Sequence, residues 1–213
     1  MYDLYLFDFD YTLVNSEKGI IDCFRKTIDQ LGYCQPSDEQ IKNTIGMSLN
    51  DTVPLFTGNS DKKHIELFTE TFLKYAETFM TPGTEFFPAA LPVLTAIKNE
   101  KKKVAIISSK RSSRIAEKFS LENATSLVDI IIGCLEVTHP KPSPEGINLV
   151  LAQLGISRER ALYIGDTIID AKAAAAAGVS FAAVTTGTTS AETFTNYPHC
   201  KIMASLTELL PIS

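Results

Sequence analysis

The sequence has few of the residues that build metal clusters, disulfide frameworks or membrane anchors. Its four cysteines are scattered, with no C-x-x-C pair and no histidine at ligand spacing, so we expect neither a zinc site nor disulfides. Reduced thiols are the rule in the cytosol. No uninterrupted apolar run is long enough to span a bilayer, and the first residues read as a strand rather than a signal peptide. We therefore expect a cytoplasmic protein.

Glycine and positive charge are also sparse where nucleotide or nucleic-acid binding would need them. The sequence contains neither a dinucleotide-binding G-x-G-x-x-G nor a P-loop, and it has no G-x-S-x-G nucleophile elbow. Its 20 Lys and Arg residues are outnumbered by 25 Asp and Glu residues, for a net charge of −5. That balance argues against nucleic acid or an anionic membrane as a partner, because both favour basic surfaces.

Short apolar runs recur along the chain, and helical patterns separate most of them. Several runs lack the polar–apolar alternation of a half-exposed strand, as expected for parallel strands that are buried on both faces. Strands that alternate with helices predict an α/β fold with a parallel sheet and right-handed crossovers. The predicted strands are residues 4–7, 104–107, 130–132, 162–164, 181–184 and, from a weaker pattern, 202–203.

One segment interrupts this alternation, because residues 16–80 show helical periodicity and no convincing strand. Apolar stripes at residues 20–31 and 65–79 repeat with the spacing of amphipathic helices. We predict a helical insert between the first strand and the rest of the sheet, with loop-like ends near Asn15 and Pro82 that act as hinges. A helical bundle that only pads the core is the alternative interpretation.

The first predicted strand is followed by two carboxylates, Asp8 and Asp10. Residues i and i+2 of a strand share a face, so we expect both side chains to point to the same side. Two carboxylates about 4 Å apart would repel by roughly 4 kcal/mol at an effective dielectric near 20, which predicts a cation between them. A strand that ends in a solvated acidic turn is the alternative interpretation of this pair.

Three other predicted strands also end in polar residues. In an open α/β sheet, ligands bind in the crevice beyond the carboxyl ends of the strands. We therefore expect these side chains to share one crevice with the first acidic pair. They are Ser108 with Ser109, Lys141 after a loop, and Asp166 with Asp170 one helical turn later.

This combination of groups fits phosphoryl transfer through a covalent intermediate. Asp8 would be the nucleophile, and Asp10 would protonate the leaving oxygen and then activate water, which is typically worth about 10²–10⁴-fold. Ser108 and Lys141 would hold the phosphoryl oxygens while negative charge spreads over them. Asp8, Asp166 and the backbone carbonyl of Asp10 would supply the hard oxygen ligands that Mg²⁺ prefers.

Four stretches of the sequence, in chain order, resemble the motifs of the haloacid dehalogenase superfamily. Residues 8–13, DFDYTL, are similar to its D-x-D-G-T-L motif, and residues 106–108 are similar to the apolar strand that ends in Thr or Ser. Lys141-Pro142 with Pro144-Glu145 resembles the third motif, and residues 165–170, GDTIID, resemble G-D-x-x-x-D. The matching branch has a helical cap inserted after the first strand, and phosphoglycolate phosphatase-like enzymes are its nearest group.

The resemblance implies a Rossmann-like core of residues 1–14 and 83–213 and a helical cap at residues 15–82. The cap would select the substrate, and residues 45–52 are the predicted reading segment, meaning the part of the cap that recognises the substrate. The resemblance also implies phosphate binding by the backbone amides of Phe9, Asp10 and Ser109, with Thr12 and Asp170 in supporting positions.

Tyr11 departs from the family pattern, because it stands where the family usually has glycine. If this position requires a positive φ, the bulky side chain is strained there. Asn15 replaces an aspartate that is common after the first motif, at a position outside the catalytic set.

Within this family the residues favour a phosphatase that acts on a small phosphorylated metabolite. Dehalogenases lack the second carboxylate of the first motif, and Asp10 supplies it here. Leu49 stands where β-phosphoglucomutase-like members have arginine in G-x-S-R. A phosphonatase would need a cap lysine that forms a Schiff base, but the pattern of the cap lysines favours solvated positions on helix faces. Inorganic pyrophosphatase, nucleotidase, phosphosugar mutase and a phosphometabolite-binding protein without turnover remain alternatives. The sequence does not predict an oligomeric state.

Lys110 and Arg111 follow Ser109 directly and allow two interpretations. They would form either a positive rim that attracts anionic substrates or a solvated start of the next helix. The sequence leaves both open.

Overall fold

The computed structural model describes residues 2–212 and divides the chain into two compact units. The core unit comprises the chain up to Val14 and from Phe86 onward, and the helical unit comprises Asn15–Glu85. The first boundary lies where the sequence predicts it. The second lies at residue 85 rather than 82.

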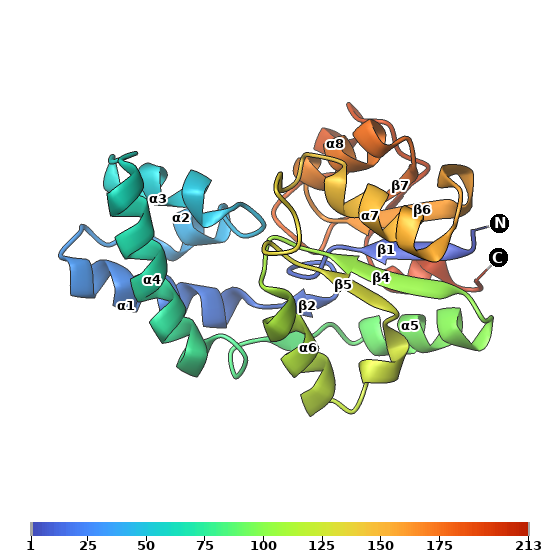
Figure 1. Cartoon of the computed structure of the whole chain (residues 1–213), viewed down its shortest axis with the longest axis horizontal. Helices are drawn as coiled ribbons and strands as arrows, with labels where there is room; N and C mark the ends of the chain where they lie inside the picture. The colour runs from blue at the N-terminus through green and yellow to red at the C-terminus, as the bar shows by residue number, and fades with distance from the viewer. Residues whose placement is uncertain (1, 213) are drawn as a thin grey trace. The chain divides into compact units, whose positions relative to one another are not determined.

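The core unit contains a six-stranded parallel sheet with the order β5-β4-β1-β6-β7-β8 (Figure 1). The α/β fold predicted from the sequence is therefore confirmed. The first strand of the chain, β1, is central and pairs with both β4 and β6. The strands are β1 (Leu4–Phe7), β4 (Lys103–Ile107), β5 (Ile130–Ile132), β6 (Ala161–Gly165), β7 (Ser180–Val184) and β8 (Lys201–Met203).

The remaining elements of the core unit surround this sheet. They are α5 (Ala90–Asn99), α6 (Ser112–Leu121), α7 (Glu145–Leu154), α8 (Ile168–Ala177) and α9 (Ala191–Phe194), with 3₁₀ turns at Thr125–Leu127, Arg158–Arg160 and Leu206–Leu209. Two short strands, β2 (Val14–Asn15) and β3 (Glu85–Phe86), pair with one another and contain the points where the chain passes between the units.

Successive residues of β1 face opposite layers of the core, as the pleat of a strand requires. Tyr5 and Phe7 pack with α5 and α6 on one face, whereas Leu4 and Leu6 pack with α7 and α8 on the other. Figure 1 shows these two helix layers on either side of the sheet. Because β1 is covered on both faces, its position is fixed and its carboxyl end is a rigid place for a functional group.

The helical unit is built from α1 (Glu17–Leu31), α2 (Asp38–Lys42), α3 (Leu49–Thr57) and α4 (Lys62–Phe79). It has an aromatic core of its own, in which the ring centroid of Phe24 lies 4.8 Å from that of Phe72, 5.4 Å from Phe56 and 6.1 Å from Phe68. Among the described residues, no helix in either unit is both long and apolar enough to cross a membrane.

A close contact between two glycines explains why the helical unit extends beyond residue 82. The backbone amide of Gly19 donates to the carbonyl of Gly83 at 3.1 Å, and Thr84 Oγ1 donates to the Met80 carbonyl at 2.8 Å. A Cβ atom on Gly83 would lie 2.5 Å from Cα and N of Gly19. The segment after Pro82 is therefore packed against α1, and the hinge near Pro82 stays a prediction.

Gly83→Ala should destabilise the protein, because the added methyl group has no space beside the backbone of Gly19. We expect the free energy of unfolding to fall by about 1–3 kcal/mol, the usual cost of overpacking. Chemical denaturation measures this change. Gly58→Asn is the control, because Gly58 has a φ of 68° with open space around it, and Asn tolerates that conformation. An unchanged denaturation midpoint for Gly83→Ala would contradict the packing argument.

Candidate active site

The carboxyl ends of the three central strands bring Asp8, Ser108 and Asp166 to one edge of the sheet. Phe7 is in register with Ile106 of β4 and Ile164 of β6, so the residues that follow all three strands are neighbours. The Asp8 amide donates to the Ile164 carbonyl at 2.9 Å, which continues the strand pairing to Asp8. The structure thus places these three residues side by side at one edge of the sheet.

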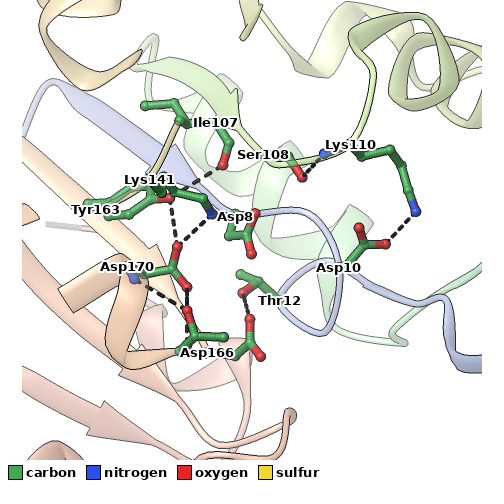
Figure 2. Close-up of polar contacts among 11 residues, drawn as sticks. Asp8, Asp10, Thr12, Ile107, Ser108, Lys110, Lys141, Tyr163, Asp166 and Asp170 are labelled. Atoms are coloured by element: carbon green, nitrogen blue, oxygen red, sulfur yellow. Dashed lines mark hydrogen bonds and ion pairs between the residues drawn. The ribbon is translucent and has the colours of Figure 1, made fainter. Parts of the chain in front are cut away.

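Lys141 joins this edge from the loop between β5 and α7 and binds two carboxylates (Figure 2). Its Nζ lies 2.9 Å from Asp8 Oδ1 and 2.7 Å from Asp170 Oδ1. All three side chains are buried. The contact with Asp8 is an ion pair without regular hydrogen-bond geometry, since Asp8 Oδ1 is a buried atom with no hydrogen bond among the described residues. Lys141 lies between Asp8 and Asp170 rather than between Asp8 and Asp10, where the sequence predicts a cation.

Asp170 has a full set of hydrogen bonds. Its Oδ1 accepts from Lys141 Nζ and from the Tyr163 hydroxyl, and its Oδ2 accepts from the amide and hydroxyl of Thr167. A carboxylate offers about four lone-pair sites, so these contacts saturate it. Thr167 caps α8 while Asp170 caps Thr167 in return, which is a capping box. The start of α8 thus fixes the Asp170 carboxylate in the position that orients Lys141.

Asp166 is buried beside the same group and is supported from the first motif. Thr12 Oγ1 donates to Asp166 Oδ1 at 3.0 Å, in agreement with a supporting position for Thr12. Gly187, in the turn after β7, gives the other oxygen its space, because a Cβ there would lie 2.0 Å from Asp166 Oδ2. A glycine is therefore required at this turn for Asp166 to keep its position.

The charges of this cluster are unbalanced. Ligand oxygens of Asp8, Asp166 and Asp170 all lie within 4.8 Å of one another. Burial raises the pKa of Asp8 to about 7, against the opposing charge of Lys141 and with the help of Asp170. Burial also raises the pKa of Asp166 well above its usual range, as do the charges of Asp170 and Asp8. For Lys141, burial alone would lower the pKa, but Asp170 and Asp8 outweigh it and raise the pKa, so the ammonium stays charged.

Such a cluster fits a divalent cation. Three buried carboxylates with one ammonium leave net negative charge in a region of low dielectric, which is unfavourable without a further cation. The available donors are carboxylate oxygens, which Mg²⁺ prefers. Because Asp170 is saturated by its hydrogen bonds, Asp8 and Asp166 are the side chains best able to serve as ligands.

Asp10 does not share this cluster, contrary to the expectation that Asp8 and Asp10 point to the same side. Its Oδ1 accepts a hydrogen bond from Lys110 Nζ at 2.7 Å, and Figure 2 shows its carboxylate pointing away from Asp8 toward Lys110. The expectation fails because β1 ends at Phe7, so the alternation of a strand does not extend to residues 8 and 10. Of the two interpretations of Lys110, a solvated helix start is wrong, since the side chain is 9% exposed.

Tyr11 adopts the left-handed conformation, with a φ of 57°. The turn is held by a hydrogen bond from the Tyr11 amide to the Val14 carbonyl at 2.7 Å, and Thr186 donates to the Tyr11 carbonyl. The position thus has the positive φ that glycine adopts readily, and a non-glycine residue there costs roughly 1–2 kcal/mol. This turn sets the directions in which Asp10 and Thr12 leave the end of β1.

Three of the residues predicted to bind phosphate line a common pocket. Ser108, Ser109 and Lys141 line one surface pocket together with Pro140 and Ser143. The Ser108 hydroxyl accepts from the Lys110 amide at 3.3 Å. The Phe9 side chain is buried in the core, so only its backbone could contact a ligand, as the resemblance implies.

Sequence reasoning missed two residues that shape this site, Tyr163 and Gly187. The Tyr163 hydroxyl donates to Asp170 Oδ1 at 3.0 Å and to the Ile107 carbonyl at 3.3 Å, so it links β4, β6 and α8. Because Tyr163 lies inside an apolar strand, the sequence pattern indicates only a core residue. Gly187 lies outside every motif, and only the approach of Asp166 reveals its role.

The sequence model of the haloacid dehalogenase-like hydrolases matches residues 5–184. This span includes every strand end that builds the acidic cluster. The chain belongs to the haloacid dehalogenase-like hydrolase family.

Known members of this hydrolase family resemble the chain over nearly its whole length. A crystal structure described as a haloacid dehalogenase-like hydrolase from Bacteroides fragilis is 42% identical, with a TM-score of 0.96, and the match covers 99% of this chain and 100% of that one. A phosphoglycolate phosphatase from Photorhabdus laumondii is 27% identical over 96% of this chain and 89% of its own. The pyrophosphatase PpaX from Bacillus cereus is 28% identical over 97% of this chain and 94% of its own.

In this hydrolase, Asp8→Asn should stabilise the metal-free protein at neutral and alkaline pH. The pKa of Asp8 is raised from 3.8 to about 7, so the folded state binds this proton more tightly than the unfolded chain. The free energy of unfolding therefore falls as the pH rises from about 4 to about 7. Removing the ionisable group removes that penalty, which we expect to be about 2–4 kcal/mol at pH 8.

Thermal unfolding in EDTA across this pH range measures the effect. The melting temperature of Asp8→Asn should exceed that of the wild type at pH 8, and the difference should shrink toward pH 4. Asp22→Asn is the control, because Asp22 pairs with Lys18 on the exposed face of α1. A pH-independent difference would show that the charge of Asp8 does not cause the loss of stability as the pH rises.

Proposed function

We propose that the protein is a Mg²⁺-dependent phosphatase that hydrolyses a small-molecule phosphate monoester through a phosphorylated Asp8. The observation that carries this proposal is the buried ion-pair network of Lys141 with Asp8 and Asp170 at the end of the central strand. It holds a carboxylate nucleophile and a cation together in a site with the oxygen donors for Mg²⁺. Family membership and relatives named as phosphatases support the same activity.

In the first half of the reaction, an oxygen of Asp8 attacks phosphorus and the bond to the leaving oxygen breaks. The Asp10 carboxyl group gives its proton to the leaving oxygen, so the product leaves as a neutral alcohol. Lys141 and the Ser108 hydroxyl hold the phosphoryl oxygens as negative charge spreads over them. For this step Asp10 must turn from Lys110, which it contacts in this structure, toward the leaving oxygen.

In the second half, water cleaves the acyl phosphate. Asp10, now a carboxylate, takes a proton from the water while the water oxygen attacks phosphorus, and the Asp8 carboxylate leaves. The products are inorganic phosphate and the regenerated Asp8. The buried hydrogen bonds of Asp170 keep Lys141 in place through both halves.

Mg²⁺ would be held by Asp8 and Asp166, with the Asp10 backbone carbonyl as the third predicted ligand. When bound, it neutralises the surplus negative charge of the carboxylates and of the phosphoryl group. Thr12 and Gly187 act on Asp166, the first by a hydrogen bond and the second by leaving space.

Phosphoglycolate-like monoesters are the substrate class we favour, and inorganic pyrophosphate is the second candidate. Relatives of both names match the chain at similar identity over most of its length. Asp10 distinguishes the site from that of a dehalogenase. Residues 45–52 remain the predicted reading segment of the helical unit, and they include the start of α3, where Ser48 caps the Asp51 amide.

The decisive experiment is hydrolysis of a panel of phosphate compounds by the wild type, Asp8→Asn and the control Asp22→Asn, each with Mg²⁺ and with EDTA. The panel includes phosphoglycolate, sugar phosphates, nucleotides and pyrophosphate. We expect Mg²⁺-dependent phosphate release that falls by at least about 10³-fold in Asp8→Asn. Activity retained in that variant would contradict the nucleophile assignment, and the preferred compound decides between the two substrate candidates.

Asp166→Ala should raise the Mg²⁺ concentration needed for half-maximal activity by at least about tenfold, since a metal ligand is removed. A Mg²⁺ titration of phosphate release measures this shift. An unaltered titration would place the metal on other residues.

A further inference from the structure

The loop between β5 and α7 carries Lys141 between two prolines, Pro140 and Pro142. Proline has no amide hydrogen, so neither neighbour of Lys141 can donate a backbone hydrogen bond that holds this part of the loop. Pro140 contributes its carbonyl, which accepts from the Ser143 amide at 3.0 Å across a tight turn. On the side that leads into this turn, the loop is instead held through the residues before Pro140.

Glu145, the first residue of α7, accepts hydrogen bonds from the two residues before Pro140. Its Oε1 accepts from the Thr138 amide at 2.7 Å, and its Oε2 accepts from the His139 amide at 2.8 Å and from the His139 imidazole at 3.0 Å. The two amide hydrogen bonds lower the pKa of Glu145, so the side chain is a carboxylate at neutral pH. One carboxylate thus joins the two sides of the loop that carries Lys141.

The start of α7 is itself fixed against the sheet. A Cβ atom on Gly146 would lie 2.9 Å from Cγ2 of Ile107, so the helix approaches the end of β4 too closely for a side chain at this position. The Glu145 amide also donates to the Ser143 hydroxyl at 3.3 Å. Glu145 is therefore anchored to the core unit, and the loop is anchored through it.

Lys141 depends on such support because its side chain is long and its ammonium serves two carboxylates. The side chain is 5% exposed, and Nζ lies 2.9 Å from Asp8 Oδ1 and 2.7 Å from Asp170 Oδ1. Four carbons with free rotation separate Nζ from the backbone. The backbone must be held in place for the ammonium to stay between both carboxylates, and a displacement of about 1 Å at a catalytic group can cost about 100-fold in rate.

We propose that Glu145 is a positioning residue, whose carboxylate holds the loop before Lys141 and thereby keeps the Lys141 ammonium in its two ion pairs. The inference deepens the proposed function and rests on it where turnover is concerned, because Lys141 is the cation proposed to hold the phosphoryl oxygens. Glu145 acts on the reaction only through Lys141, since the atoms that its carboxylate binds belong to the loop.

Two variants of Glu145 and one matched control test the proposal. Glu145→Ala removes the acceptor of both amides. Glu145→Gln keeps one carbonyl oxygen but turns an NH₂ group, which cannot accept, toward the other amide. Glu208→Ala is the control, because Glu208 Oε1 also accepts two amides, those of Ala204 at 2.7 Å and Ser205 at 3.3 Å, in a 3₁₀ turn outside the site.

Reductive methylation of the lysines, followed by peptide mass spectrometry, measures whether Lys141 leaves its ion pairs. In the wild type, Lys141 should react far more slowly than Lys62, whose side chain is 90% exposed. Glu145→Ala should speed the reaction of Lys141 at least about tenfold, the usual effect of losing hydrogen bonds to a charged group. Glu145→Gln should have a smaller effect in the same direction, and Glu208→Ala should leave Lys141 at its wild-type rate.

Lys118 is the internal control for loosening of the whole core unit, because its side chain is only 10% exposed. It should react at the wild-type rate in every variant. Unchanged methylation of Lys141 in Glu145→Ala would overturn the proposal. An equal increase at Lys118 would also overturn it, since Glu145 would then stabilise the core unit in general and not the position of Lys141.

Turnover supplies the second measurement and separates the inference from the proposed function. Glu145→Ala should lower kcat/KM for the preferred compound of the phosphate panel about 10- to 100-fold, the effect of a displaced catalytic group. Glu208→Ala should keep the wild-type value. Wild-type turnover by Glu145→Ala would overturn the positioning role. If the wild type hydrolyses no compound of the panel, the proposed function fails, and the methylation experiment still decides whether Glu145 holds Lys141.

Discussion

The ion pairs that Lys141 makes with Asp8 and Asp170 are the interaction on which the rest of the site depends. They join the loop before α7, the end of β1 and the start of α8 through one buried ammonium. Removal of Lys141 would leave the buried carboxylates of Asp8 and Asp170 without their cation, and the loss of one side of a buried ion pair typically costs about 3–5 kcal/mol. The hydroxyls of Tyr163 and Thr167 also donate to the Asp170 carboxylate, so the hydrogen-bond network extends to β6 and to the cap of α8. The position of the Asp8 carboxylate is therefore fixed by the sheet and the helix cap together.

The same network keeps two aspartates of one short motif in different environments. Asp8 lies in a dry, acidic cluster where burial raises its pKa to about 7, whereas Asp10 lies beside Lys110. The turn at Tyr11, with its positive φ, separates the direction of Asp10 from that of the strand. The nucleophile and the proton carrier that we propose need different surroundings, and the chain provides this difference within three residues. The metal-free protein is destabilised as a result, because the carboxylates of the cluster repel one another.

The sequence predicted the elements that follow from local patterns and failed where partners are distant. All six strands of the core sheet were foreseen, because buried parallel strands are continuous apolar runs. The two-residue strands β2 and β3 carry no such pattern. The alternation of β1 ends at Phe7 and does not continue to Asp10, so the predicted direction of Asp10 is wrong. Its partner Lys110 and the packing of Gly83 on Gly19 depend on residues far away in the chain, and no local spacing encodes them.

The order of strands has a consequence for synthesis of the chain. β1 is made before the other five strands of its sheet, yet it lies between β4 and β6, which begin at Lys103 and Ala161. The strand before Asp8 therefore leaves the ribosome long before either neighbour exists, whereas the helical unit is contiguous and precedes both. Contacts between distant residues form slowly, so a nascent chain can fold its helices while its first strand is still unpaired. A chain that stops before Gly165 has neither Asp166 nor Asp170, so its Asp8 has no acidic cluster to join.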